Sequence, residues 1–126
     1  MPLSVTIVIE GRPRPQKRPR VYGQRTVDPS AGEKQAFLLL ALPHRPEAVA
    51  DYTGPVTVDL TFGYTDLIGS ADIDNLAKFV LDALNGWFYH DDRQIVTLHA
   101  AKVAVDRDCT TVTITYAALG VSRNAV

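Results

Sequence analysis

Apolar side chains at every second position restrict the fold of this chain more than any other feature. In the clearest case, segment 56–64, apolar residues alternate with polar ones: Val56, Val58, Leu60, Phe62 and Tyr64 against Thr57, Asp59 and Thr61. The segments 5–9, 94–103 and 111–116 also favour strands. Successive side chains of a strand point to opposite faces. The resulting sheet therefore has one apolar face, which other elements must cover.

Two segments are expected to form helices that cover this face. Residues 28–30 read Asp-Pro-Ser, a helix start with an acceptor side chain and a proline in the first turn, and a capping box to Glu33 is an option. This helix should end at Pro43, because proline cannot continue a helix. Residues 74–85 have helical periodicity, and Gly86 is well placed to end the second helix.

The expected order of elements is β-α-β-α-β-β. It predicts the α+β fold class, with two helices packed on one face of a mixed sheet. With 126 residues, of which 46% are hydrophobic, the chain is expected to form a single domain over residues 1–126. The single cysteine, Cys109, excludes a disulfide within the chain and favours a reducing compartment. No signal-peptide pattern or membrane-spanning apolar run is present, so we expect a cytoplasmic protein with no membrane partner.

The basic residues are concentrated in one stretch, although the net charge is only −1. Between positions 11 and 25 there is no acidic residue, and six of the thirteen Lys and Arg residues lie there: Arg12, Arg14, Lys17, Arg18, Arg20 and Arg25. Three prolines exclude a helix between positions 11 and 20 and predict an extended loop. Charged loops are often merely solvated. The lack of acids and the stiffness of the prolines nevertheless favour a surface that binds DNA phosphates.

The second helix separates an apolar side from a polar one. Its expected apolar stripe consists of Leu76, Val80, Ala83, Leu84 and Trp87. The opposite side carries Asp74, Lys78, Asp82 and Asn85. We interpret Asp82 as a solvated residue or as a salt-bridge partner of Lys78.

Carboxylates gather before and after this helix. Asp72 and Asp74 stand at its start, and Asp91 and Asp92 follow it. Alone, an aspartate at a helix start is a common cap, and Asp74 with Lys78 would be a common i, i+4 pair. If the chain returns the second pair to the helix start, three carboxylates would meet and repel each other. A hard divalent cation such as Mg²⁺ would relieve that repulsion.

The same residues resemble a known signature. Asp72-Ile-Asp-Asn-Leu-Ala-Lys78, then Asp82-Ala-Leu-Asn85, then Asp91-Asp-Arg-Gln-Ile-Val96 resemble the core of the RusA family of Holliday-junction resolvases. The opening Gly11-Arg-Pro-Arg-Pro15 and Lys102, at the end of the following strand, are similar to features of that family.

The resemblance implies a metal-dependent endodeoxyribonuclease that cuts branched DNA by paired phosphodiester hydrolysis, with a role in recombination and repair. It implies that Asp72, Asp74 and Asp92 bind the metal and are catalytic, with Asp91 as the alternative ligand, and that Lys78 is catalytic. The implied cofactor is Mg²⁺, with Mn²⁺ as an alternative. It also adds Lys102 to the DNA-binding residues of the basic loop.

A homodimer is the expected assembly, because a four-way junction has two-fold symmetry and needs two symmetric cuts. The largely apolar segment 36–42 also exceeds what one sheet face should need. Two alternatives stay open. One is a non-catalytic DNA-binding protein whose acids serve folding, and the other is a nuclease of the same fold that cuts flaps or forks.

Overall fold

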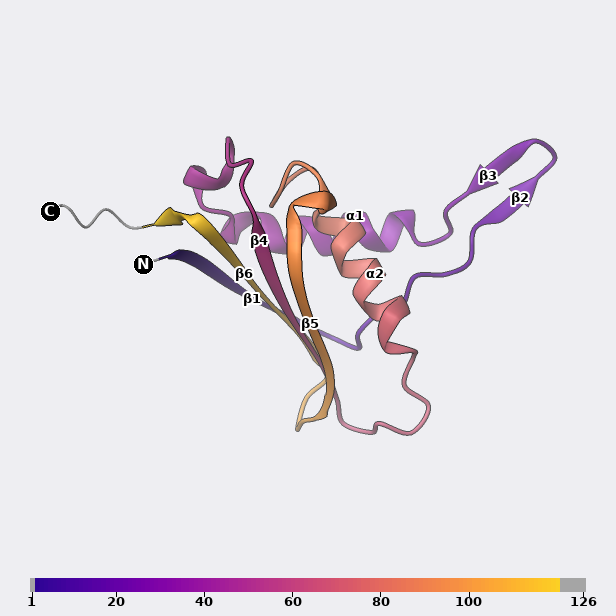
Figure 1. The fold of residues 1–126 in the computed structure, drawn as a ribbon. Coiled ribbons are helices and arrows are strands. Elements are labelled where there is room, and N and C mark those ends of the chain that lie inside the picture. The colour runs from indigo at the N-terminus through magenta and orange to yellow at the C-terminus, as the bar shows by residue number, and fades with distance from the viewer. Residues whose placement is uncertain (1, 121–126) are drawn as a thin grey trace, which may run out of the picture.

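A mixed sheet of four long strands forms the body of the protein in the computed structural model, which describes residues 2–120 (Figure 1). The strands are β1 (Pro2–Glu10), β4 (Val56–Tyr64), β5 (Ile95–Ala104) and β6 (Cys109–Gly120). Their order in the sheet is β1-β6-β4-β5. β4 and β5 are parallel, whereas the other neighbours are antiparallel. β1 and β5 are therefore the edges of the sheet.

The helices α1 (Ala31–Ala41) and α2 (Ile73–Leu84) lie side by side on one face of this sheet (Figure 1). Phe37 of α1 and Phe79 of α2 meet edge to face, with ring centroids 5.8 Å apart. The apolar side chains of β4 are buried beneath them. The opposite face carries Thr57 and Thr61 of β4 and Thr111, Thr113 and Thr115 of β6, whereas Thr110 is buried on the helix side. The predicted α+β class, with two helices on one face of a mixed sheet, is confirmed. None of the helices described in residues 2–120 has the length and apolar character needed to cross a bilayer.

α2 has the boundaries that its flanking residues favour. Asp72 is its N-cap, and Gly86, with φ +86°, follows the C-cap Asn85. Its buried face includes Leu76, Val80, Ala83 and Leu84, as predicted. Trp87 was expected in the same stripe, but it is 48% exposed and Phe88 is fully buried instead. The reason is that the chain leaves the helix after Leu84, so helical periodicity no longer places residue 87.

α1 begins after Ser30 as expected, but the predicted capping box is wrong. The hydroxyl of Ser30 makes no cap hydrogen bond and instead accepts the backbone N–H of Lys17 at 2.9 Å. Glu33 pairs with Arg14 and Lys17 rather than with the cap residue. The side chains at the start of α1 thus bind the basic loop rather than capping the free backbone N–H groups of the helix's own first turn.

The rest of the connection to β4 is short and irregular. Two 3-10 turns, η1 (Leu42–His44) and η2 (Glu47–Val49), follow α1. Leu39 and Leu40 of α1 are each 59% exposed, which agrees with the expectation that this helix has more apolar surface than the sheet covers.

A small hairpin, β2 (Arg20–Tyr22) with β3 (Arg25–Val27), projects away from the sheet (Figure 1). The predicted extended loop holds as far as Pro19, but the hairpin was not predicted. The sequence does contain a pattern typical of a hairpin, because strand-forming residues stand on both sides of the two-residue turn Gly23-Gln24. The φ of +62° at Gly23 suits the first central position of a type II′ turn.

Two leucines on the helices test this packing. Leu76→Ala on α2, where the side chain is fully buried, should lower the free energy of unfolding by about 2–5 kcal/mol, because it leaves a cavity. Leu39→Ala on α1 is the matched control and should change it by no more than about 0.5 kcal/mol. Urea unfolding measures both, and equal losses would contradict the described burial.

Candidate active site

Two unpaired carboxylates stand at the start of α2. Asp72 has the extended backbone of an N-cap, but its side chain caps no N–H group. Asp74, in the first turn, accepts only the backbone N–H of Asn75, at 2.9 Å. Both residues are exposed, and within residues 2–120 neither forms an ion pair. The carboxylates are therefore free to bind a cation at the end of the helix that favours anionic groups.

An ammonium group from β5 lies beside these carboxylates. The Nζ of Lys102 donates to the hydroxyl of Ser70 at 3.0 Å and to the carbonyl of Ala71 at 3.1 Å, just before Asp72. Lys102 is opposite Phe62 of β4, whose side chain is buried on the helix side of the sheet. The sheet thus holds Lys102 against the turn that carries the acids.

The basic loop passes along the same turn. The backbone N–H of Gln16 donates to the carbonyl of Asn75 at 3.0 Å, so the loop is bound to the first turn of α2. Arg12 donates to the carbonyl of Gly69 at 3.4 Å, and its guanidinium carbon lies 5.0 Å from the ring centroid of Tyr64. Arg12 and Lys102 therefore both contact the segment 69–71, which leads into the acid-bearing start of α2.

Some of the predicted DNA-binding residues are engaged within the chain, and others are free. Arg14 and Lys17 pair with Glu33 at 2.6 and 3.1 Å and tie the loop to α1. The exposed basic residues of the hairpin region form no ion pair within the described part of the chain: Arg18, Arg20 and Arg25.

A network of hydrogen bonds and ion pairs around Asp28 anchors the basic loop to α1. It was not predicted from the sequence. The carboxylate of Asp28 accepts hydrogen bonds from the Gln16 amide at 2.9 Å, the Ser30 backbone N–H at 2.9 Å and the Lys34 ammonium at 2.8 Å. Lys34 also contacts Asp82 of α2 at 3.2 Å. These residues come from three separate segments, so their meeting depends on the helix packing and left no local pattern to detect.

Lys78 lies one turn beyond Asp74 on the exposed side of α2. Its Nζ is 3.3 Å from Asp82, so the predicted pair with Asp82 is present, whereas no pair with Asp74 occurs in residues 2–120. The Lys78 side chain is 61% exposed, so it is not confined to this partner.

Asp91 and Asp92, the second acidic pair, differ in their contacts. Asp91 caps the short 3-10 helix η3 (Asp92–Gln94), accepting the Arg93 backbone N–H at 2.9 Å and its guanidinium at 3.1 Å. These hydrogen bonds, that of the backbone N–H above all, hold the pKa of Asp91 below its ordinary value. Asp92 is exposed and forms no ion pair in residues 2–120, so it is the freer carboxylate.

Asp92 lies at the opposite end of α2 from Asp72 and Asp74. Gln94 donates to the carbonyls of Tyr52 and Gly54, which fixes η3 beside the start of β4. α2 has 12 residues, about 18 Å at 1.5 Å each, and Figure 1 shows η3 at one end of it and the turn before Ile73 at the other.

The expectation that three carboxylates converge within one chain is therefore wrong. No group of three or more Asp, Glu, His or Cys residues is placed to hold a metal ion in the described residues. The physical reason is the parallel pairing of β4 and β5, because the helix between parallel strands must run back along the sheet. The chain after α2 then lies far from the helix start.

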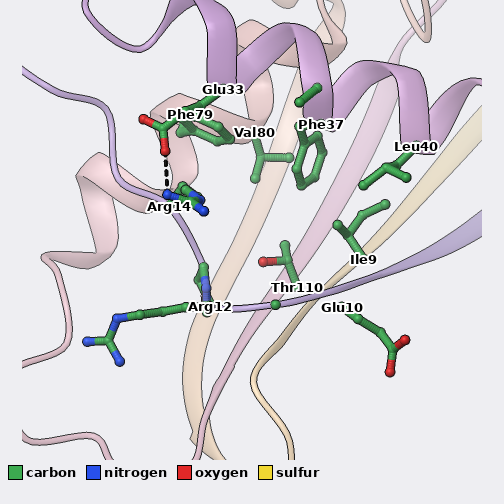
Figure 2. Close-up of a pocket in the computed structure, with 13 residues that line it drawn as sticks. Ile9, Glu10, Arg12, Arg14, Glu33, Phe37, Leu40, Phe79, Val80 and Thr110 are labelled. Atoms are coloured by element: carbon green, nitrogen blue, oxygen red, sulfur yellow. Dashed lines mark hydrogen bonds and ion pairs between the residues drawn. The ribbon is translucent and has the colours of Figure 1, made fainter.

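A cavity of about 220 Å³ lies elsewhere, between β1, α1 and the start of the basic loop. Its walls are mainly apolar, with Phe37, Leu40 and Phe79 among them, and Figure 2 shows Arg14 bonded to Glu33 at its rim. None of the four predicted catalytic residues lines it. The acid-bearing turn of α2 is therefore the candidate site, rather than this cavity.

Comparison with known proteins assigns the family. The family model described as Endodeoxyribonuclease RusA matches residues 10–115, which include every predicted site residue. A protein of Bacillus subtilis (strain 168), described as Uncharacterized protein YqaN, is 33% identical over 115 residues, covering 75% of this chain and 80% of that protein. The chain belongs to the RusA endodeoxyribonuclease family.

The Asp28 network makes a prediction about pH. The Lys34 ammonium, which donates to the carboxylate, is the main cause that lowers the pKa of Asp28 from 3.8. A lowered pKa in the folded state stabilises the protein above the unfolded-state pKa, and that stabilisation is lost as the pH falls through the folded-state pKa. Asp28→Asn should therefore be less stable than wild type at pH 7, and the difference should begin to shrink as the pH falls through about 3.8 and disappear only below the lowered folded-state pKa.

Urea unfolding across this pH range measures the difference. In a Lys34→Gln background the effect of Asp28→Asn at pH 7 should shrink, because the main partner is gone. A difference that stays constant as the pH falls from 7 into the acid range where Asp28 is protonated in both states would show that the charge of Asp28 is not what stabilises the loop.

Proposed function

We propose that this protein is a divalent-metal-dependent endodeoxyribonuclease that cleaves branched DNA, resolving Holliday junctions by paired cuts during recombination and repair. The observation that carries the proposal is the pair of unpaired carboxylates, Asp72 and Asp74, on a turn flanked by Lys102 and Arg12. Membership of the RusA family supports the substrate class.

The carboxylates fit a hard cation. Asp72 and Asp74 provide the oxygen ligands that Mg²⁺ or Mn²⁺ prefers. Asp92, which lies at the far end of α2 in its own chain, would complete this set only from the second chain of the expected homodimer. When bound, such an ion supplies Lewis acidity and lowers the pKa of a bound water. The ammonium of Lys102 and the free N–H groups at the start of α2 would stabilise negative charge on a phosphate placed there.

Lys78 is proposed to contact the scissile phosphate. It lies on the same exposed side of α2 as Asp74, and its long side chain is mostly in solvent. To act, its ammonium exchanges Asp82 for a phosphate oxygen. Asp82 keeps Lys34 as a partner when this happens, so no carboxylate is left unpaired.

The basic loop and hairpin are proposed to hold the DNA. Prolines and contacts to α1 and α2 stiffen the loop, so little entropy is lost on binding. A two-stranded ribbon has the width to enter a major groove, and Arg20 and Arg25 of the hairpin are free to contact phosphates.

One observation favours a non-catalytic DNA-binding protein as a second candidate. In the described part of a single chain no three carboxylates are grouped for a metal ion. Such a protein would keep the basic arm and use the acids only to cap and solvate helices.

Cleavage of a synthetic four-way junction in Mg²⁺ tests the first proposal. Asp74→Asn should lower the cleavage rate roughly 100-fold or more, since a metal ligand is lost, while DNA binding persists. Asp51→Asn, an exposed aspartate outside the site, is the control and should cleave at the wild-type rate. Parallel reactions on a flap, a fork and a linear duplex measure the substrate preference.

The same experiment has an outcome that favours the second candidate. If wild type and Asp74→Asn bind the junction equally and neither cuts it with Mg²⁺ or Mn²⁺, the protein is not a nuclease. Faster cleavage of the flap or fork than of the junction would instead show the other nuclease of this fold.

Salt dependence of binding tests the hairpin. Replacing Arg20 and Arg25 together by Gln should reduce the slope of log K against log salt by about 1.8, because each phosphate contact contributes about 0.9. The charge-preserving pair Arg20→Lys and Arg25→Lys should keep the wild-type slope. A wild-type slope in the Gln double variant would mean that the hairpin does not touch DNA.

A further inference from the structure

The connection between β4 and α2 carries two exposed apolar side chains beside the candidate active site. Ile68 is 87% exposed and Leu67 is 42% exposed, and both stand just ahead of Asp72. Figure 1 shows this connection projecting beyond the sheet at the end where α2 begins. Single exposed apolar residues are common on protein surfaces, so the support and the neighbours of these two decide whether they have a function.

The apolar tip, Leu67 and Ile68, is part of a tight turn. The backbone N–H of Ser70 donates to the carbonyl of Leu67 at 3.2 Å, which closes a four-residue turn with Ile68 and Gly69 at its centre. The φ of +81° at Gly69 is that of the third residue of a type II turn, a position that favours glycine. The carboxylate of Asp66 accepts the backbone N–H of Ile68 at 2.9 Å and adds a second hydrogen bond to the turn.

The rest of the protein holds both ends of this turn. The backbone N–H of Thr65 donates to the carboxylate of Asp108, between β5 and β6, at 2.7 Å. On the other side, the side chains of Arg12 and Lys102 donate to the segment 69–71. The tip is thus presented to solvent in a defined position, so little entropy would be lost when it inserts into a ligand.

The surroundings of the tip favour a nucleic-acid partner. The segment 67–71 contains no charged residue, yet Arg12 and Lys102 contact it and the carboxylates of Asp72 and Asp74 follow it. A DNA backbone bound at those acids would place its bases next to the tip. Two side chains are also too few for a protein partner, since each side of a stable protein interface buries about 800 Å².

Apolar side chains bind DNA by inserting between neighbouring base pairs and unstacking them. In a continuous duplex such an insertion must break intact stacking. At a branch point the stack is already interrupted, so less stacking is lost when a side chain enters, as it is for a mismatched base. An apolar tip beside the acids would therefore act with less cost on branched DNA than on duplex DNA.

Given the proposed nuclease function, on which this inference rests, we infer that Leu67 and Ile68 form an apolar wedge that opens base pairs at the branch point of the bound DNA. Ile68, at the centre of the turn, inserts between the bases, and Leu67 contacts the neighbouring base pair. The wedge contributes selectivity for branched over duplex DNA at the site that Asp72 and Asp74 form.

Cleavage of two matched junctions tests the wedge. Ile68→Ser should cleave a fully paired four-way junction about tenfold more slowly than wild type, because the branch point must open without the inserted side chain. On a junction whose branch point carries mismatched, already unpaired bases, Ile68→Ser and wild type should cleave at equal rates. Ile68→Leu keeps the apolar volume and should cleave the paired junction at close to the wild-type rate.

Two controls exclude a general defect. Val8→Ser, at a 56% exposed position of β1 outside the site, makes a similar change and should cleave both junctions at the wild-type rate. The urea midpoint of Ile68→Ser should equal that of wild type, because the replaced side chain is exposed.

Base opening gives a readout that does not depend on cleavage. In EDTA, which prevents metal-dependent cleavage, 2-aminopurine placed next to the branch point should brighten when wild type binds, because the base becomes unstacked. The double variant of Leu67→Ser and Ile68→Ser should still bind the junction through the basic loop, but the fluorescence should stay at the level of the free junction.

The outcomes separate this inference from the proposed function. Active wild type with an equally active Ile68→Ser on the paired junction would overturn the wedge and leave the nuclease proposal standing. A defect of Ile68→Ser that persists on the mismatched junction would also overturn it, since the side chain would then act on another step. Inactive wild type would reject the nuclease proposal; the fluorescence in EDTA then decides alone, and its absence with wild type overturns the wedge.

Discussion

The parallel pairing of β4 with β5 is the constraint on which the rest of the structure depends. Parallel neighbours require a connection that returns along the whole sheet, and α2 makes this return. Its start therefore lies at one edge of the strands and its end at the other. The acids before the helix and the acids after it are held apart by the same geometry that buries the helix.

α1 has a second task besides covering the sheet. Ser30 and Glu33 at its start, with Asp28 just before it, bind the backbone and side chains of the basic loop, and Asn75 of α2 binds it again. The loop is thus attached to both helices before the hairpin departs. These noncovalent contacts hold the basic loop against the first turn of α2, which carries Asp74.

Several features could be predicted from local patterns. The alternation of apolar and polar residues identified the long strands, and the helical spacing of apolar residues identified the buried face of α2. Gly86 indicated where α2 ends. The Asp72–Lys78 signature identified the family, because it is contiguous in the chain. Local patterns failed where the partners come from separate segments, as with Ser30, whose hydroxyl accepts the backbone N–H of Lys17. They also failed beyond the end of a helix, as with Trp87, which helical periodicity no longer places.

The four long strands, the two helices and the apolar face of each follow from the sequence alone, because they depend on side-chain chemistry and on spacings of two or 3.6 residues. Which charges are paired depended on tertiary packing, as with Arg14 and Lys17, which pair with Glu33 of α1. The tertiary structure alone decided which carboxylates are neighbours. Asp72, Asp74 and Asp92 are 20 residues apart at most, yet α2 sets Asp92 at the far end of the sheet. Residues that are near in sequence need not be near in space when a rigid helix lies between them.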